Sequence, residues 1–481
     1  MVWGCSLLSN LQWGYSGFRV RFECSEIDDC SRSALYTSKR VPVLSAVQSN
    51  GSIEGRATEI NPPHQQVSVS HSEKSRSRTQ TQEARRFVCS GEMEDSEFED
   101  VLDEWFIESL TAYKDLHVYQ LEHPTQVIEW TSGKTVCVAG FSSSKNELLE
   151  LRLPLKLFAE ENKGLCAERD FKVVHGGFSE GPVSCLRHVP GTRLIVTNDG
   201  RGTDLQVWDL GGEESDVIRR TGSVKGMESA SKRGSRIAAS ASPSPQVLHG
   251  AESSSVQLTQ LTSGQSLYKL ETDSADPLNS LQFTGDAVFL AGCSNGKMYL
   301  ADTRTPAAPL MSPPPPSSGQ SVVWWTDASA DPQQPSCRVV RLSSSGHAVV
   351  SDLRKLGEAA CQAQLDVHGR PDNVTVSWAP RRNCISVSGF SGVVEIYDTR
   401  DWRTALRRAP PLFQHRGHAV SCQQTDGCDP VRITAHVWHP ERPQTLLSTA
   451  SDGSVHVWDW VEPDANRLES QSEPSIEQDQ K

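Results

Sequence analysis

The sequence has no hydrophobic run long enough to span a bilayer and no excess of positive charge. A membrane-spanning helix needs about 20 consecutive apolar residues, and no stretch of the 481 residues approaches that length. The formal net charge is −13, which argues against general nucleic-acid binding, because that binding requires a positive field. The first ten residues also lack the basic start and apolar core of a secretory signal. We therefore expect a cytosolic protein with possible access to the nucleus.

The chain also lacks the cysteine spacing of a common metal or redox site. None of its 13 cysteines forms a Cys-x-x-Cys pair. Cys137, Cys185, Cys293 and Cys384 lie in or beside apolar, strand-like runs, where a cysteine behaves as a small buried hydrophobe in a reduced compartment. No Gly-x-Gly-x-x-Gly loop occurs either. The sequence therefore predicts no cofactor and no metal.

The most informative stretch is 446–460, which reads LLSTASDGSVHVWDW. Two apolar runs flank Ser451-Asp452-Gly453, and an Asp-Gly between alternating β-branched residues predicts a hairpin, because glycine supplies the positive φ of the turn. After the turn, His456, Trp458 and Trp460 fall on one face of the strand. Upstream stands Gly417-His418. A Gly-His, a run of strands and a closing Trp-Asp form the signature of one blade of a β-propeller.

Similar strand patterns recur through the chain, with about seven units ending in comparable strands. The closing strands are 148–153, 205–210, 256–259, 298–302, 348–352, 394–398 and 454–460. A short four-stranded sheet cannot bury its own faces, but blades stacked in a ring cover one another. The fold predicted is all-β, a seven-bladed WD40-type β-propeller. Leu116–Leu121 precedes the first full blade, so we predict that it is the outer strand of the last blade and closes the ring.

The flanking segments differ in composition from the repeats. Residues 1–92 are predicted to be a disordered extension, because 47–86 are polar with few aromatics. We divide the rest into an acidic lead-in with a short helix (93–115, helix at Asp103–Tyr113), the propeller (116–462) with long loops at 211–246 and 306–336, and a disordered acidic tail (463–481).

Resemblance to WD repeats implies a buried hydrogen-bond relay in the last blade. By that resemblance, His418 bridges the turn carboxylate of Asp452 and the hydroxyl of Thr449, which meets the indole N–H of Trp458. Such a relay gives each buried polar group a partner. The role is structural, and no catalytic or partner-binding residue is assigned.

Three alternative interpretations of the sequence have candidate residues: a zinc site, an enzyme and a phosphopeptide-binding adaptor. A zinc site could use two His-x-x-His pairs with nearby cysteines, namely His415, His418, His436, His439, Cys422 and Cys428. On a strand, however, positions i and i+3 face opposite sides. A metal-dependent or hydrolytic enzyme could use the propeller channel, since Gly177–Gly181 matches Gly-x-Ser-x-Gly, although a strand-like run follows where the nucleophile elbow needs a helix.

The third of these functions is that of a phosphopeptide-binding adaptor, which would use Arg338 and Arg341. Separately, the basic run Lys225–Arg236 could contact an acidic surface such as a tubulin tail, or RNA, but a solvated loop explains it as well.

Specific strings take the resemblance further than the blade pattern does. They are 103–110, 161–165, 168–173, 175–179, 377–380, 415–418 and 446–460. They resemble one branch of the WD-repeat proteins, the WD repeat-containing protein 73 family, over roughly 93–461. The resemblance implies a non-enzymatic scaffold that assists cytoplasmic assembly of the RNA endonuclease module of the Integrator complex. It also implies roles in microtubule organisation and cell division, with localisation to the cytoplasm, cytoskeleton, spindle pole and cleavage furrow. The implied partners are Integrator cleavage-module subunits and tubulin, without direct contact to nucleic acid or membrane.

Overall fold

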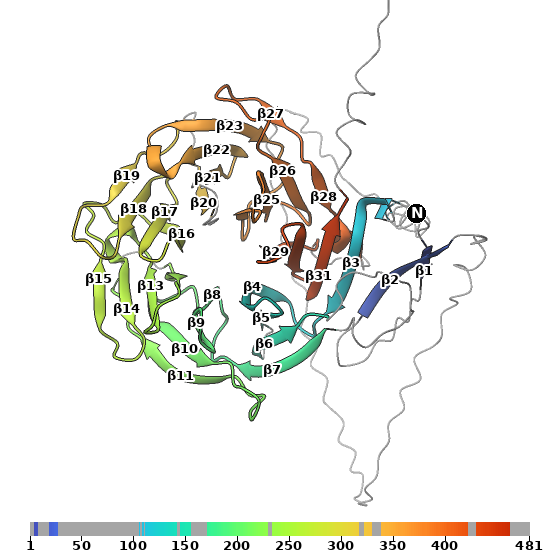
Figure 1. Cartoon of the computed structure of the whole chain (residues 1–481), viewed down its shortest axis with the longest axis horizontal. Coiled ribbons are helices and arrows are strands. Elements are labelled where there is room, and N and C mark those ends of the chain that lie inside the picture. Colours follow the sequence, from blue (N-terminus) through green and yellow to red (C-terminus); the bar gives the residue numbers. More distant parts are fainter. Residues whose placement is uncertain are drawn as a thin grey trace, which may run out of the picture. The chain divides into compact units, whose positions relative to one another are not determined.

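The computed structural model describes a ring of antiparallel sheets (Figure 1). The residues described are 4–7, 19–26, 105, 108–109, 111–141, 145–154, 171–228, 233–316, 322–329, 338–421 and 430–461. Within these ranges the strands form seven blades around a common centre, which confirms the predicted fold class. None of the described helices is long and apolar enough to cross a membrane.

The blades follow chain order, and the first strand of each lies nearest the centre of the ring. Blades 1 and 2 comprise β4 (Thr125–Ser132), β5 (Thr135–Phe141), β6 (Asn146–Arg152) and β7 (Lys172–Phe178), then β8 (Cys185–His188), β9 (Leu194–Asn198), β10 (Leu205–Asp209) and β11 (Arg219–Val224). Blades 3 and 4 comprise β12 (Arg236–Ala238), β13 (Gln246–Gly250), β14 (Gln257–Gln260) and β15 (Ser266–Lys269), then β16 (Leu278–Phe283), β17 (Val288–Cys293), β18 (Met298–Asp302) and β19 (Leu310–Ser312). A 3₁₀ turn, η3 (Ser253–Ser255), precedes β14.

Blades 5 to 7 contain short elements besides their four main strands. Blade 5 comprises β20 (Trp324–Ala328), β21 (Arg338–Ser343), β22 (His347–Asp352) and β23 (Ala359–Leu365), with the 3₁₀ turn η4 (Leu353–Lys355). The short β27 (Arg408–Ala409) adds to β23 in parallel. Blade 6 comprises β24 (Thr375–Trp378), β25 (Cys384–Ser388), β26 (Val394–Asp398) and β28 (Phe413–His415). Blade 7 comprises β29 (Ile433–Trp438), β30 (Thr445–Ala450), β31 (Ser454–Trp460) and β3 (Tyr113–Gln120), and the helix α2 (Gly417–Ser421) lies between blades 6 and 7 in the chain.

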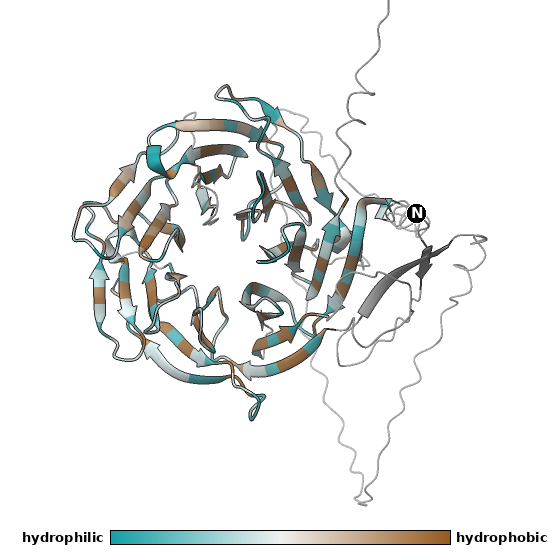
Figure 2. Ribbon diagram, viewed as in Figure 1, coloured by the Kyte–Doolittle hydropathy of each residue, from teal (hydrophilic) through white to brown (hydrophobic). Residues whose placement is uncertain are grey.

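The hydrophobic core lies between neighbouring blades. In one cluster Leu342 and Val350 of blade 5 pack with Trp378 and Ile385 of blade 6, and all four side chains are buried. Apolar residues recur along the strands of all the blades (Figure 2), and successive side chains of a strand point to opposite faces of its sheet. Each blade therefore depends on its neighbours for burial, as a ring of small sheets requires.

The ring is closed by the two ends of the propeller sequence. β3 pairs antiparallel with β31 over seven residue pairs, from Tyr113↔Trp460 to Gln120↔Ser454. The N–H of Leu121 then donates to the carbonyl of Gly453 at 2.9 Å. The predicted closure is confirmed, with the strand beginning at Tyr113 rather than Leu116.

Both predicted long loops contain strands, which corrects that prediction. β11 and β12 lie within 211–246, and β19 and β20 lie within 306–336. Three of these strands carry little local signal for a physical reason: β12 and β19 are only three residues long, and β11 is an exposed outer strand without an apolar alternation.

The predicted extension also contains structure. Within 1–92 the structure describes β1 (Gly4–Leu7) and β2 (Arg19–Glu26), which pair with each other, and β2 pairs with β3. The prediction of a disordered segment is therefore wrong for these two strands; the rest of 1–92 and the tail from 463 lie outside the described residues. Trp105, Glu108 and Ala112 are helical, as predicted, but Tyr113 already belongs to β3.

Candidate functional site

A buried hydrogen-bonded relay occupies blade 7, where the sequence placed it. Nδ1 of His418 lies 2.7 Å from Ser454 Oγ, and Nε2 lies 2.8 Å from Ser448 Oγ. Ser454 Oγ donates to Asp452 at 2.6 Å, and the indole N–H of Trp458 donates to Ser448 Oγ at 3.2 Å. His418, Asp452 and Trp458 thus belong to one network, linked by two serines that the sequence analysis did not assign.

The chemistry of the two ends fixes the direction of the relay. An indole N–H can only donate and an ionised carboxylate can only accept. Trp458 therefore donates to Ser448, and Ser448 donates to Nε2 of His418. Nδ1–H of His418 then donates to Ser454, which donates to Asp452. This sequence of bonds satisfies every group in the relay only when His418 is neutral with its proton on Nδ1.

Thr449 does not take part, which corrects the predicted relay. Its hydroxyl lies 3.0 Å from Thr434 Oγ1 and 3.3 Å from the carbonyl of Ala435. Adjacent residues of a strand face opposite sides, and Ser448 is paired with His456, on the face that carries Trp458. The alternation of the hairpin, which already placed His456 with Trp458, was the signal that would have selected Ser448.

Two further histidines extend the relay toward the ring closure. The Tyr113 hydroxyl lies 2.8 Å from Nδ1 of His415, and Nε2 of His415 lies 3.0 Å from Nδ1 of His456. The rings of His418 and His456 stack with centroids 3.6 Å apart at 11°, and His415 stacks on Trp458 at 4.5 Å. Because Tyr113 belongs to β3, the stack joins the closing strand to blades 6 and 7.

The glycine of the Gly-His pair is required by this stack. A Cβ at Gly417 would lie 2.9 Å from Cε1 of His415 and 3.2 Å from Nδ1 of His456. Both rings are buried and cannot move away freely. Glycine at this position is therefore a packing requirement.

The zinc set considered as an alternative is not assembled in the residues that the structure describes. His436 lies between Ser386 and Ser388, with its ring nitrogens 2.7 and 2.8 Å from their hydroxyls. Nδ1 of His439 accepts from the backbone N–H of Glu441 at 3.1 Å. Cys422 and Cys428 lie outside the described residues. His436 and His439 therefore serve separate structural contacts.

A different trio, His415, His418 and His456, does bring a nitrogen from each ring within 4.8 Å of the other two. A metal ion lies near the plane of each imidazole that binds it. The rings of His418 and His456 are nearly parallel and 3.6 Å apart, so their planes do not meet at a common point. The trio as it stands is a hydrogen-bonded stack and not a chelating set.

Burial keeps the stacked histidines neutral. It lowers the pKa of His415 and of His418 well below the ordinary value, and the neighbouring His456 adds to the effect. Burial also lowers the pKa of His456 to about 3. Neutral rings each carry one donor and one acceptor, as the relay requires.

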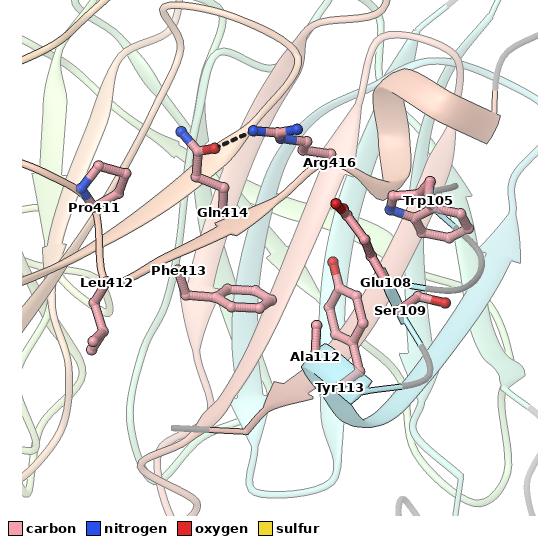
Figure 3. Close-up of a pocket in the computed structure, with 10 residues that line it drawn as sticks. All are labelled: Trp105, Glu108, Ser109, Ala112, Tyr113, Pro411, Leu412, Phe413, Gln414 and Arg416. Atoms are coloured by element: carbon pink, nitrogen blue, oxygen red, sulfur yellow. Dashed lines mark hydrogen bonds between the residues drawn. The ribbon is translucent and has the colours of Figure 1, made fainter. Parts of the chain in front are cut away.

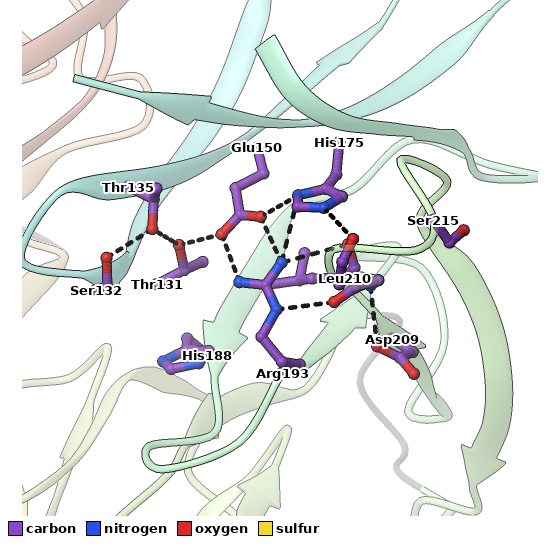
Figure 4. Close-up of polar contacts among 12 residues, drawn as sticks. Thr131, Ser132, Thr135, Glu150, His175, His188, Arg193, Asp209, Leu210 and Ser215 are labelled. Carbon is purple, nitrogen blue, oxygen red and sulfur yellow. Dashed lines mark hydrogen bonds and ion pairs between the residues drawn. The ribbon is translucent and has the colours of Figure 1, made fainter. Parts of the chain in front are cut away.

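A second polar network joins blade 1 to blade 2 (Figure 4). The buried carboxylate of Glu150 on β6 accepts two hydrogen bonds from Arg193, at 2.9 and 2.6 Å. It also accepts from Thr131 at 2.8 Å and lies 2.7 Å from Nδ1 of His175. Burial raises the pKa of Glu150, but these hydrogen bonds outweigh it and leave the pKa below its ordinary value. The ion pair of Glu150 with Arg193 therefore connects blade 1 to blade 2.

An open pocket of about 320 Å³ lies beside the closing strand (Figure 3). Tyr113 and Phe413 meet edge to face in its wall, with ring centroids 5.3 Å apart. Glu108 and Arg416 also line the pocket, and Arg416 donates to Gln414 at 2.7 Å. Behind Tyr113 lies the buried histidine stack, so the pocket marks the seam where the ring closes.

The residues considered for the alternative hydrolase and phosphopeptide sites are held in separate structural contacts. Ser179 follows β7, its hydroxyl donates to the carbonyl of Gly181 at 2.6 Å, and the next element is β8, so no nucleophile elbow forms at this serine. Arg341 is buried and donates to the carbonyl of Pro313 at 2.8 Å. Arg338 donates instead to Asn383. The two arginines therefore share no surface for a phosphopeptide.

The fold and the relay define the class of the protein. The chain is a WD-repeat β-propeller, and residues 411–459 match the family described as WD domain, G-beta repeat. That match covers blade 7 from its Gly-His to its Trp-Asp, the part of the chain that holds the relay.

Comparison with whole proteins identifies the branch. The chain is 49% identical to the Integrator complex assembly factor WDR73 of Danio rerio, over 76% of this chain and 99% of that protein. It is 40% identical to the proteins of the same name from Xenopus laevis and Homo sapiens, over 97% and 98% of their lengths and about three quarters of this chain. The chain therefore belongs to the WDR73 family of WD-repeat proteins.

Proposed function

We propose that this chain is a non-enzymatic scaffold that assists assembly of the Integrator complex, and specifically of its RNA endonuclease module. The observation that carries the proposal is the 49% identity to a protein named as an Integrator complex assembly factor, over nearly all of that relative's length. The identity extends over 373 residues, far more than one blade contains. A rigid disc that presents loops and edges to partners suits this role.

The geometry supports a binding role over catalysis. The stacked histidines at blade 7 are buried and neutral, and both ring nitrogens of His418 have hydrogen-bond partners, so these histidines hold the ring together and are not exposed to a substrate. Ser179, which the Gly-x-Ser-x-Gly string singled out, bonds to the backbone and has no elbow to activate it. A binding role would therefore use the loops and edges that the ring presents.

The test is affinity purification of the tagged chain, expressed at its endogenous level, with quantitative mass spectrometry of the recovered proteins. We expect subunits of the Integrator cleavage module to be enriched. Ser179→Ala should recover them unchanged, because no step uses that hydroxyl. Recovery of tubulin without Integrator subunits would contradict the proposal, and so would loss of assembly in Ser179→Ala with a folded ring.

We propose further that effects on microtubules, the spindle pole and the cleavage furrow follow indirectly from assembly in the cytoplasm. Two residues of the basic run that was considered for a tubulin tail have other contacts: Lys225 pairs with Asp204 at 2.6 Å, and Arg236 lines the channel. Co-sedimentation of the purified chain with microtubules decides the point. We expect no saturable binding, and saturable binding would show that the contact is direct.

A further inference from the structure

The centre of the ring holds a cavity of about 410 Å³ lined by the first strand of every blade. This volume falls at the small end of the range for small-molecule sites. Polar side chains supply much of the lining, among them Ser280, Thr375 and Ser377. The cavity is therefore large enough and polar enough to hold a small hydrophilic ligand.

Most of the charges in the cavity are already paired. Arg187 donates to Glu129 at 2.9 Å and also to the carbonyl of Leu186. Asp327 accepts from the backbone N–H of Trp378 at 2.8 Å. Burial raises the pKa of Asp327 to about 7, so near neutral pH this carboxyl carries less than a full negative charge.

Arg236 is the exception. It lies on β12, lines the cavity and is only partly exposed. Among the residues that the structure describes, no carboxylate or other acceptor contacts its guanidinium. Burial, reinforced by the positive charges of Arg187 and Arg233, lowers the pKa of Arg236. The protein thus places a cation in a confined space without supplying its counter-charge, which is costly unless a ligand or solvent compensates.

We propose that the central channel binds a small oxyanion, a phosphate or a carboxylate group, with Arg236 as its charged anchor. A guanidinium presents a planar fork of donors that matches two oxygens of such a group. Arg187 lies in the same cavity, where it is paired with Glu129, and the hydroxyl of Ser280 offers a further donor. The proposal is independent of the scaffold role.

The experiment measures the thermal midpoint of the full chain during titration with sodium phosphate, sulfate or acetate, against sodium chloride at equal ionic strength. Binding to the folded state alone raises the midpoint, and we expect a saturable rise of about 2 °C or more. The phosphate and acetate arms distinguish a phosphate from a carboxylate ligand. ³¹P line broadening of inorganic phosphate by the protein provides a second readout.

The decisive variant is Arg236→Gln, with Arg219→Gln as its matched control on the exposed outer strand β11. Without oxyanion, Arg236→Gln should melt at or above the wild-type midpoint, because it removes an unpaired charge. With oxyanion, the wild type and Arg219→Gln should gain stability and Arg236→Gln should not. Equal gains in all three proteins, or no gain beyond chloride in the wild type, would overturn the proposal. If Arg236→Gln fails to fold, Arg236→Lys must still show weaker phosphate broadening than the wild type.

Discussion

The imidazole of His418 and the indole of Trp458 meet at a single hydroxyl, that of Ser448, at 2.8 and 3.2 Å. All three side chains are buried. This oxygen therefore accepts from Trp458 on β31 and donates to His418, the residue that follows Gly417. This contact ties the start of blade 7 to its third strand.

Ser448→Ala should lower the free energy of unfolding by about 1–3 kcal/mol, because it leaves two buried groups without a partner. Ser351→Ala is the matched control, since Ser351 is equally buried on β22 but its hydroxyl has no hydrogen-bond partner. That substitution should be close to neutral. Urea unfolding of both variants checks the difference, and equal losses would mean that the shared hydroxyl has no special role.

Gly417→Ala should be destabilising by about 1–3 kcal/mol, the cost of overpacking a filled site. The added methyl would contact the rings of His415 and His456, and both rings are buried in close-packed surroundings. Gly212 is the control, because a Cβ there has nothing within 4 Å. Thermal melts of the two variants should separate clearly. If Gly417→Ala and Gly212→Ala had the same thermal midpoint, the histidine rings would be able to shift and accommodate the methyl group.

Glu150 and Arg193 should show strong coupling in a double-mutant cycle. Glu150→Gln leaves Arg193 without its counter-charge, and we expect a loss of about 2 kcal/mol, less than for a fully buried pair because the Arg193 side chain is 43% exposed. The loss in the double variant should be smaller than the sum of the single losses. Additive losses would mean that the two blades are not joined through this pair.

His436 should make stability depend on pH. Burial lowers its pKa to about 3, so between roughly pH 6.5 and 3 the unfolded state binds a proton that the folded state does not. Its contribution is complete above pH 6.5 and is lost as pH falls. Relative to His436→Gln, the wild type should lose about 1.4 kcal/mol between pH 7.5 and 5.5.

The comparison with His436→Gln removes opposing contributions. Burial raises the pKa of Asp327 to about 7 and of Asp459 to about 6, so these groups stabilise the fold as pH falls, but both variants share them. Urea unfolding at the two pH values gives the difference. A constant gap between the two proteins would show that His436 titrates alike in the folded and unfolded states.

The architecture could be predicted from the sequence because blade 7 shows its turn and its strand alternation within one short stretch of residues. The Asp-Gly turn and the alternation of 454–460 predicted the hairpin and, with Leu116–Leu121, the closure of the ring. Short strands were missed: β12 has three residues, too few to show a period of two. Such short strands form because they pair with a neighbouring strand of the same blade, and this pairing leaves no local pattern in the sequence.

The site was predicted less completely than the fold. The resemblance to WD repeats supplied His418, Asp452 and Trp458, but it named Thr449 where strand alternation selects Ser448. His415 was considered only as a metal ligand, whereas the structure stacks it on Trp458. Contacts such as Tyr113 with His415 join residues 302 positions apart, and they follow from the register of β3 rather than from any motif.

The central claim is that the strand at Tyr113–Gln120 and the hairpin at 445–460 form one blade that closes the ring. Hydrogen–deuterium exchange of the full chain, followed by mass spectrometry, tests it most directly. The account predicts that amides of Tyr113–Gln120 are protected as strongly as those of Thr445–Ala450, and that low urea exposes both together. Rapid exchange of 113–120 while 445–460 stays protected would contradict it.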